Sequence, residues 1–465
     1  MKQTVLALLA LVSTVFAAAF AADVLPSSPK GQLVRQYLDA FNSGEPAMRA
    51  FLERTPSAIA MDERIARYRG MKSDIGSFTP LRLVAENGDS LEVIVRTADG
   101  RELSLNVKFA GDPPHIAGMR IERVDADSTP GAGGPPADER TVLRHIQSQL
   151  EEKAKAGEFS GTILVARGSE VIWQGAFGQA NQAEHIPNQI DTRFDVGSIA
   201  KSFTAVAIGQ LLEKGKLKLT DKVGVYLPNY PNPAVREQVT IDQLLQMSSG
   251  IGDFFGEKFQ KAPKDKIRTL ADYLPFFATE PLQFPPGSNR KYSNGGYLVL
   301  GLIIEAVSGE SYYDYVKKNI FERAGMKDTA FGFRDGADTK QAIGYTTMSD
   351  SGRESPGSPR HPNLAVMPAR GSSAGSAQST VADLFSFYQA LAAGKLVSGD
   401  TLAKLDIHPD GMGIAGGAPG VNAALDTGVP GAGSASYTVV VLSNFDPPSA
   451  EKASKEVRSL LRRAK

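Results

Sequence analysis

A stretch from Asp125 to Glu139 divides this chain of 465 residues, because it contains little that could be buried in a core. It reads Asp-Ala-Asp-Ser-Thr-Pro-Gly-Ala-Gly-Gly-Pro-Pro-Ala-Asp-Glu, and such a density of proline, glycine and small polar residues is typical of a flexible linker. The chain is also too long for one ordinary domain. We therefore expect a small folded domain at 27–125, a linker at 126–139 and a larger domain at 140–465.

The first residues have the pattern of an export signal. Lys2 supplies a positive start, an apolar run follows from Val5 to Phe20, and Ala19-Phe20-Ala21 forms a small-x-small cleavage site. A buried helix or a membrane anchor is the alternative, but the run is short for a membrane span, which needs ~20 apolar residues. We expect residues 1–21 to be a removed signal peptide, which leaves a periplasmic or secreted protein without a membrane span.

Composition excludes several partners and cofactors. The chain has 51 Lys and Arg against 51 Asp and Glu, so no global charge favours nucleic acid or an anionic membrane as a partner. It contains no cysteine, which excludes disulfides, a thiol nucleophile and Cys-ligated metals. The sequence shows neither a histidine pair at ligand spacing nor a glycine-rich phosphate loop. We expect no metal and no organic cofactor; the oligomeric state stays open.

Residues 27–125 have the pattern of a small α+β domain. Gln32 to Asn42 has apolar residues at helical spacing, and two further short helices are expected up to Arg69. Three strands are expected after them, separated by Asn-Gly and Asp-Gly turn signals, at Leu81–Val84, Leu91–Arg96 and Leu103–Phe109. This order, with the phrase Tyr37-Leu-Asp-Ala-Phe-Asn-Ser-Gly44, resembles the cone-shaped domains of the nuclear transport factor 2-like group. The resemblance implies a folded accessory module.

The larger domain begins and ends with strands. A helix from Thr141 to Ala156 precedes two strand-like runs, and Ser436 to Asn444 is a strongly β-branched strand followed by a helix from Glu451 to Arg463. The section between them is rich in helical periodicity. We therefore expect both ends of this domain to meet in one sheet, with helices packed around it.

Ser-x-x-Lys is the first pattern with catalytic chemistry. On a helix, residues at i and i+3 are neighbours, so a buried lysine can serve as the base that activates the serine. The pattern occurs four times, but only Ser198 and Lys201 open a strongly apolar helix, where a lysine is costly unless its amine has a role. Free backbone N–H groups at such a helix start also suit an oxyanion. The alternative is a capping serine with a lysine that reaches solvent.

Tyr-x-Asn is the second pattern. Tyr230-Pro-Asn232 reads as a turn. Tyr292-Ser-Asn294 instead enters an apolar helix, where a tyrosine could carry a proton between nucleophile, leaving group and water. The alternative for the second pair is a capping asparagine beside a packed tyrosine.

Together these segments resemble the serine β-lactamase and penicillin-binding-protein group, which includes class C β-lactamases, D,D-peptidases, D-aminopeptidases and carboxylesterases. The similarity covers residues from about 140 to the C-terminus. It implies a β-lactamase-like domain, an antiparallel sheet flanked by helices with a helical subdomain, in an α/β and α+β multidomain chain. It also implies Ser198 as the acylated nucleophile, Lys201 as base, Tyr292 as proton shuttle and Asn294 as a substrate contact. The segments that carry it are Phe194-Asp-Val-Gly-Ser-Ile-Ala-Lys-Ser-Phe-Thr-Ala205, Thr240-Ile-Asp-Gln-Leu-Leu-Gln-Met-Ser-Ser-Gly-Ile251, Pro286-Gly-Ser-Asn-Arg-Lys-Tyr-Ser-Asn-Gly-Gly-Tyr297 and Ala324-Gly-Met-Lys-Asp-Thr329.

The third motif of this group departs from its usual form. The group has Lys or His, any residue, then Gly, whereas this chain has Ile414 at the cation position and Gly416 at the glycine. The resemblance implies the N–H groups of Ser198 and Gly417 as oxyanion donors, which survive a change of side chain. Ile414 disfavours substrates with a carboxylate, such as β-lactams. We expect a serine hydrolase that acts on a small ester or amide and favours neutral esters; the alternative is a non-catalytic protein that recognises cell-wall peptide fragments.

Overall fold

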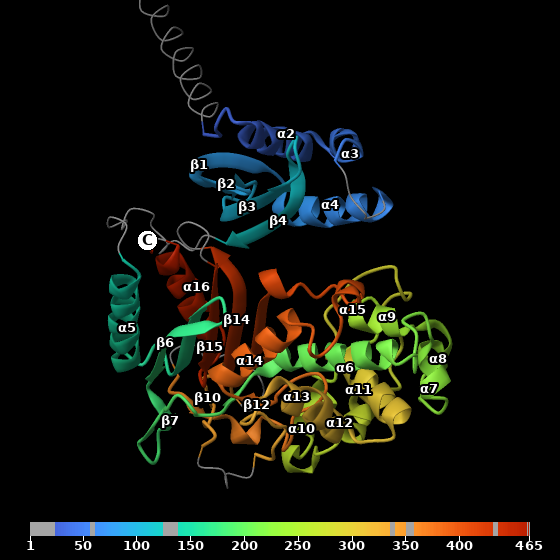
Figure 1. The fold of residues 1–465 in the computed structure, drawn as a ribbon. Coiled ribbons are helices and arrows are strands. Elements are labelled where there is room, and N and C mark those ends of the chain that lie inside the picture. Colours follow the sequence, from blue (N-terminus) through green and yellow to red (C-terminus); the bar gives the residue numbers. More distant parts are fainter. Residues whose placement is uncertain are drawn as a thin grey trace, which may run out of the picture. The chain divides into compact units, whose positions relative to one another are not determined.

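The computed structural model describes residues 24–55, 61–123, 138–334, 340–349, 358–430, 436–462 and 464. The chain forms two compact units, residues 1–133 and 134–465, which are coloured along the sequence in Figure 1. The expected signal peptide at 1–21 and most of the expected linker at 126–139 lie outside the described residues. Among the described helices, none has both the length and the apolar character that a membrane span requires.

In the described part of the N-terminal unit, three helices precede a four-stranded antiparallel sheet in the order β1-β2-β3-β4. The expected order of helices followed by a meander is confirmed, but the fourth strand was not expected, since His115, Arg120 and Arg123 weaken its apolar pattern. The likeness to cone-shaped domains stays a prediction. The elements are α2 (Pro29–Ser43), α3 (Glu45–Glu53), α4 (Met61–Ile75), β1 (Phe78–Asn87), β2 (Ser90–Thr97), β3 (Glu102–Ala110) and β4 (His115–Arg123).

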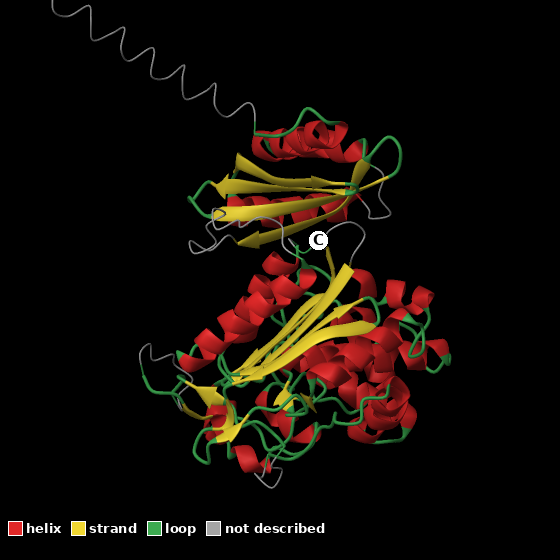
Figure 2. Ribbon diagram, turned by 60° about the vertical axis from the view of Figure 1, so that its left-hand side comes forward, coloured by secondary structure: helices red, strands yellow, loops and turns green. Residues whose placement is uncertain are grey.

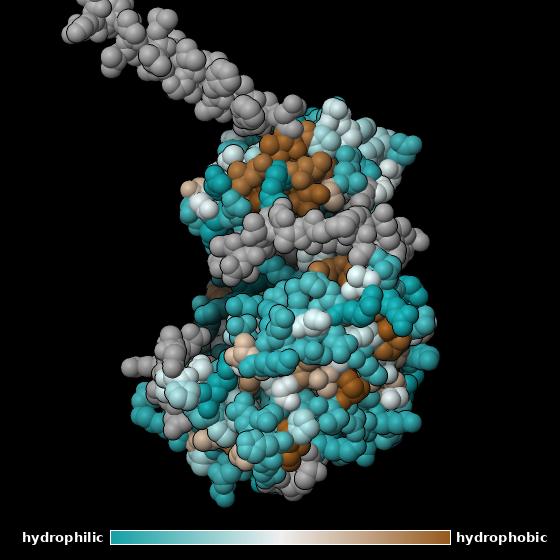
Figure 3. All heavy atoms as spheres, turned by 90° about the vertical axis from the view of Figure 1, so that its left-hand side faces the viewer, coloured by the Kyte–Doolittle hydropathy of each residue, from teal (hydrophilic) through white to brown (hydrophobic). Residues whose placement is uncertain are grey.

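The N-terminal unit has its own apolar core. Phe41 of α2 is fully buried and packs against the rings of Tyr68 and Phe78. Alternate residues of β3 face this core, as the two-residue period of a strand requires. Figure 3 shows hydrophobic residues gathered on one face of this unit, and its edge strand β1 exposes Leu83 and Val84.

In the described part of the C-terminal unit, one antiparallel sheet contains five strands in the order β13-β14-β15-β5-β6. The strands of this sheet are β5 (Gly161–Arg167), β6 (Glu170–Phe177), β13 (Gly413–Ala418), β14 (Val421–Pro430) and β15 (Ser436–Ser443). The pairing of β15 with β5 confirms the expectation that both ends of the domain meet in one sheet. β13 is an edge strand, and its open side faces the turn that carries Ser198.

Helices cover both faces of this sheet (Figure 2). Successive residues of a strand point to opposite faces of the sheet. Val439 and Val441 accordingly pack with the helices at 139–155 and 449–461. Val440 and Leu442 pack on the other face, with the helical part. The helices are α5 (Glu139–Lys155), α6 (Lys201–Glu213), α7 (Val223–Tyr226), α8 (Pro233–Gln238), α9 (Ile241–Leu245), α10 (Glu257–Lys261), α11 (Asn294–Ser308), α12 (Tyr312–Val316), α13 (Glu322–Ala324), α14 (Val381–Ala392), α15 (Gly399–Lys404) and α16 (Ser449–Leu461). Two-residue and three-residue strands complete the unit: β7 (Gln179–Asn181), β8 (Ile186–Pro187), β9 (Phe194–Asp195), β10 (Tyr345–Thr346), β11 (His361–Pro362) and β12 (Gln378–Ser379).

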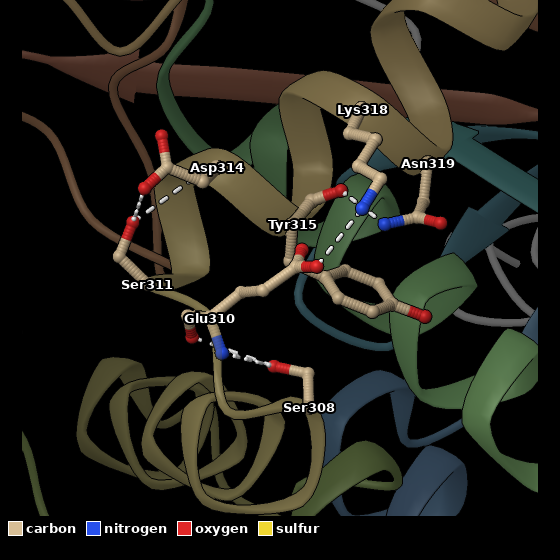
Figure 4. A network of polar contacts seen from close by, with 7 residues as sticks. All are labelled: Ser308, Glu310, Ser311, Asp314, Tyr315, Lys318 and Asn319. Carbon is tan, nitrogen blue, oxygen red and sulfur yellow. Dashed lines mark hydrogen bonds and ion pairs between the residues drawn. The ribbon is translucent and has the colours of Figure 1, made fainter.

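The turn between α11 and α12 is held by a polar network on the helical part (Figure 4). Ser311 caps α12 by accepting the N–H of Asp314, and its hydroxyl donates back to that carboxylate at 2.6 Å. Lys318, which follows α12, pairs with Glu310 of this turn at 3.0 Å. The network fixes α12, whose first residue Tyr312 reaches Thr204 of α6 with its hydroxyl at 2.8 Å. It thereby helps to hold the helix that carries Lys201.

Candidate active site

Ser198 lies in a 3-10 turn, η1 (Gly197–Ala200), directly before α6. The apolar helix expected from Ser198 onward therefore starts three residues later, and the serine stands at its entrance. Gly197 has φ +51°, a left-handed conformation that glycine adopts without strain. Its N–H donates to Asp195 Oδ1 at 2.8 Å, and Asp195 forms a buried ion pair with Arg334. The backbone that presents Ser198 is therefore anchored to a buried charge pair.

Lys201 is the first residue of α6 and is only 6% exposed. Its Nζ lies 3.3 Å from Ser198 Oγ, donates to Asn294 Oδ1 at 2.6 Å and donates to the carbonyl of Ala374. The last two groups are acceptors only, so a neutral amine would spend both N–H groups on them and turn its lone pair toward the serine. Burial lowers the pKa of Lys201 to about 7, because desolvation disfavours the ammonium form. Lys201 can therefore accept a proton near neutral pH.

Tyr292 approaches the serine from the segment before α11. Its hydroxyl donates to Ser198 Oγ at 2.6 Å, and its ring lies 4.8 Å from Lys201 Nζ. The side chain is 52% exposed, so it borders solvent while its hydroxyl faces the nucleophile. Partial burial raises the pKa of Tyr292, which keeps the phenol protonated at neutral pH. It can thus donate a proton to a leaving group.

Asn294 occupies the first turn of α11, but Ser293 is the residue that caps this helix, accepting the N–H of Gly296 at 2.9 Å. The Asn294 side chain is therefore available for the site. Its Nδ2 donates to Asp253 Oδ2 at 2.7 Å, which orients Oδ1 toward Lys201. Asp253 also accepts the backbone N–H of Asn294 at 3.2 Å.

Sequence reasoning missed Asp253 and the carbonyl of Ala374. Asp253 stands two residues past Thr240–Ile251, a segment that resembles the group, and that adjacency was the available signal. Its carboxylate raises the pKa of Lys201 against the larger effect of burial. The carbonyl at residue 374 carries no side-chain signal at all, so sequence reasoning could not have found it.

β13 supplies the wall opposite the nucleophile's turn. A Cβ at Gly416 would lie 2.0 Å from the carbonyl oxygen of Val196 and 2.8 Å from the nitrogen of Ser198, so only glycine fits there. A Cβ at Gly197 would lie 2.7 Å from the nitrogen of Gly417. The backbone nitrogens of Ser198 and Gly417, the two expected oxyanion donors, are thus close neighbours.

Ile414 is placed differently from the other expected site residues. It is partly buried and packs against the main apolar core of the unit, and it is absent from the described residues that line the cavity at Ser198. Its neighbour Ala415 does line that cavity. The first Tyr-x-Asn pair is a turn as expected, with Tyr230 buried and Asn232 capping α8.

A cavity of about 790 Å³ opens at Ser198. Its wall includes Tyr292, Asn294, Gly416 and Gly417, together with a group of aromatic rings from the segment after Asp253. These rings are Phe254, Phe255, Phe259 and Tyr273. Ser198, Lys201 and Tyr292 could serve as nucleophile, base and acid, and with two backbone N–H groups at one apolar cavity such a set suits acyl transfer.

Comparison with known proteins identifies the family of the larger unit. A family model described as Beta-lactamase matches residues 145–462. Penicillin-binding protein 4* of Bacillus subtilis (strain 168) is 34% identical over 254 residues, which cover 53% of this chain and 55% of that protein. The chain thus matches about half the length of this curated relative.

Solved structures show the same fold. The crystal structure of a penicillin-binding protein from Bacillus halodurans has a TM-score of 0.59 and 32% identity, and the match covers 68% of this chain and 99% of that one. EstCE1, a hydrolase with promiscuous acyltransferase activity, has a TM-score of 0.56 at 19% identity, covering 70% of this chain and 99% of its own. At that identity the second match speaks for the fold alone.

Proposed function

Because this chain belongs to the beta-lactamase family of serine hydrolases, we propose that it acts through an acyl-enzyme on Ser198 and favours neutral esters over those that carry a carboxylate. One observation carries the proposal: Ser198 Oγ lies 2.6 Å from the hydroxyl of Tyr292 and 3.3 Å from Nζ of Lys201, whose pKa of about 7 makes it a base. The proposed nucleophile therefore lies within hydrogen-bonding distance of both the proposed acid and the proposed base.

In the proposed acylation, Lys201 takes the proton of Ser198 and Oγ attacks the carbonyl carbon. The N–H groups of Ser198 and Gly417 would hold the oxyanion. When the bond to the leaving group breaks, Tyr292 donates its proton to the departing oxygen and is reprotonated from the Lys201 ammonium. In the deacylation that follows, water loses a proton to Lys201 and Tyr292, and its oxygen bonds to the carbonyl carbon. The bond to Ser198 Oγ then breaks, and the serine leaves with a proton.

The preference for neutral substrates rests on the charges of the cavity. Two lysines lie at or beside it, and the Nζ atom of each already donates to acceptors of the protein. Lys264 donates to the carbonyls of Phe259, Gln260 and Ala262 at 2.6, 3.0 and 2.9 Å. Lys201 is held by Asn294 and Ala374. Binding a substrate carboxylate would have to break such contacts, whereas an apolar ester could use the aromatic wall.

Export and the role of the N-terminal unit belong to the same proposal. The pattern of residues 1–21 supports secretion to the periplasm or exterior. The helices and antiparallel sheet of the N-terminal unit support an accessory module of the nuclear transport factor 2-like kind.

A second function is favoured by one observation, the absence of a motif cation at Ile414. It is a non-catalytic protein that binds cell-wall peptide fragments. Incubation with a fluorophosphonate probe separates the two functions, because only an activated serine displaces its fluoride. We expect mass mapping to find the label on Ser198 and expect turnover of p-nitrophenyl butyrate. Absence of both would leave the binding function.

A further inference from the structure

Glu451 is a carboxylate at the catalytic cavity that the proposed mechanism does not use. It lies in the first turn of α16 and lines the same cavity as Ser198. Its Oε2 is buried and accepts no hydrogen bond within the part of the chain that the structure describes. A buried carboxylate oxygen without a donor is unfavourable unless something supplies one, since desolvation of the charge is then uncompensated.

The position of Glu451 is fixed relative to the oxyanion strand. Asn422 of β14 is fully buried; its Oδ1 accepts the N–H of Glu451 at 3.2 Å, and its Nδ2 donates to the carbonyl of Gly416 at 3.0 Å. Pro447, just before α16, also lines the cavity and would lie 2.7 Å from a Cβ at Gly417. The start of α16 is therefore built onto the strand that carries the expected oxyanion donor.

The charged groups around this carboxylate leave it available to a substrate. Glu451 stands in the first turn of α16, where the partial positive charge of a helix start attracts an acidic side chain. Among the described residues that line the cavity, the other charged side chain is Lys264, which is occupied by three carbonyl oxygens. Glu451 is thus the charge at this wall that a substrate can meet.

We propose that Glu451 determines substrate specificity at this site, by selecting esters or amides that carry a protonated amine and by repelling those that carry a carboxylate. The ammonium group would pair with the Glu451 carboxylate at the cavity wall, while the rest of the substrate contacts the aromatic rings. This inference rests on the proposed hydrolase function and adds the chemical class of the substrate.

Matched esters test the inference. The p-nitrophenyl esters of 6-aminohexanoate and heptanoate and the mono-p-nitrophenyl ester of adipate differ at the end of an acyl chain of similar length, which is cationic, neutral or anionic. A second set carries aminomethyl, ethyl or carboxyl groups on the phenol of an acetate ester, in case the leaving group faces Glu451. In at least one set we expect kcat/KM to be highest for the cationic ester, and Glu451→Gln to lower the cationic-to-neutral ratio roughly tenfold or more. Glu451→Lys should invert the order of the charged esters.

The control is Glu456→Gln, which removes a carboxylate of the same helix that pairs with Lys153 at the surface. Its ratios should equal those of the wild type. If wild type and Glu451→Gln share the same charge preference in both sets, the inference is overturned. Failure of the proposed function has a different signature, because neutral heptanoate ester would then not be hydrolysed and Ser198 would not react with a fluorophosphonate.

Discussion

The hydroxyl of Tyr292 lies closer to Ser198 Oγ than the amine of Lys201 does, at 2.6 Å against 3.3 Å. In the proposed mechanism the nearer group is nevertheless the acid of the pair. Partial burial raises the pKa of Tyr292, so it holds its proton, whereas full burial lowers the pKa of Lys201 to about 7. These opposite pKa shifts in adjacent groups support the proposed roles of acid and base.

Removing the nucleophile should abolish activity and spare the fold. Ser198→Ala is expected to lose hydrolysis of p-nitrophenyl butyrate by at least about 1000-fold. The thermal midpoint should hardly change, because one hydroxyl of a partly buried turn contributes little packing. Initial rates and a melting curve check both parts. Turnover in the variant would show that another group attacks the ester.

The pH dependence of acylation should follow Lys201. Only the neutral amine accepts the serine proton, so kcat/KM should fall roughly tenfold per pH unit below the lysine pKa of about 7 and level off above it. Lys201→Arg keeps a positive charge that does not deprotonate and should lose at least about 100-fold. Measuring kcat/KM from about pH 5 to about pH 9 gives the acid limb of this profile. An arginine variant with wild-type activity would contradict Lys201 as base.

Asp253 is predicted to be a positioning residue that acts through Asn294. Its negative charge raises the pKa of Lys201, so Asp253→Asn should shift the acid limb of the pH profile to lower pH. Loss of one charge-assisted hydrogen bond should also lower kcat/KM roughly tenfold. Asp265→Asn, at an exposed site, serves as control. An unshifted limb with lowered activity would indicate a purely structural role.

The buried pair of Asp195 and Arg334 should matter for stability. Both side chains are nearly inaccessible, at 7% and 6% exposed, so removing one partner leaves a buried charge alone. Arg334→Met is expected to cost about 3–5 kcal/mol of unfolding free energy. Adding Asp195→Asn should recover part of that loss. Chemical denaturation of the single and double variants measures it, and additive losses would argue against coupling.

Two neighbouring positions on β13 test which residue faces the cavity. Ala415 lines it, whereas Ile414 packs against the apolar core. Ala415→Lys should therefore raise acylation by benzylpenicillin relative to a neutral ester by roughly tenfold, through a charge-assisted contact with the carboxylate. Ile414→Lys should instead lower the thermal midpoint, since its stem and charge enter the core. Acylation ratios and melting curves distinguish the two positions, and a gain at 414 would reverse the assignment.

Local patterns predicted most of what the structure brings together at the site. Ser198 and Lys201 are one turn apart, and Tyr292 and Asn294 stand at the start of one helix, so short spacings together with the apolar helices that follow them nominated these residues. Their meeting across the chain followed from the family resemblance. Asp253 and the carbonyl of Ala374 depend on contacts between distant segments, which no local pattern encodes.

In the fold, too, the elements with a clear local pattern were the ones that could be predicted. The strand at Ser436–Ser443 was predicted from its β-branched run, and so was its union with the strands near residue 161. The strand His115–Arg123 was missed because polar residues interrupt it, although its backbone pairs along β3. The side-chain direction of Ile414 depends on the register of β13 against β14, which motif alignment does not supply.

The pairing of β15 with β5 also determines when the larger unit can finish folding. During synthesis the hairpin of β5 and β6 emerges early, yet its neighbour in the sheet is made only after the whole helical part has followed. Such distant pairing slows folding, because a long loop must close before the strands join. β13, which carries the expected oxyanion donor Gly417, is likewise among the last strands to be made. A nascent or C-terminally truncated chain would contain Ser198 and Lys201 but not the complete sheet. We therefore expect these two residues to reach their final geometry only when the whole unit has folded.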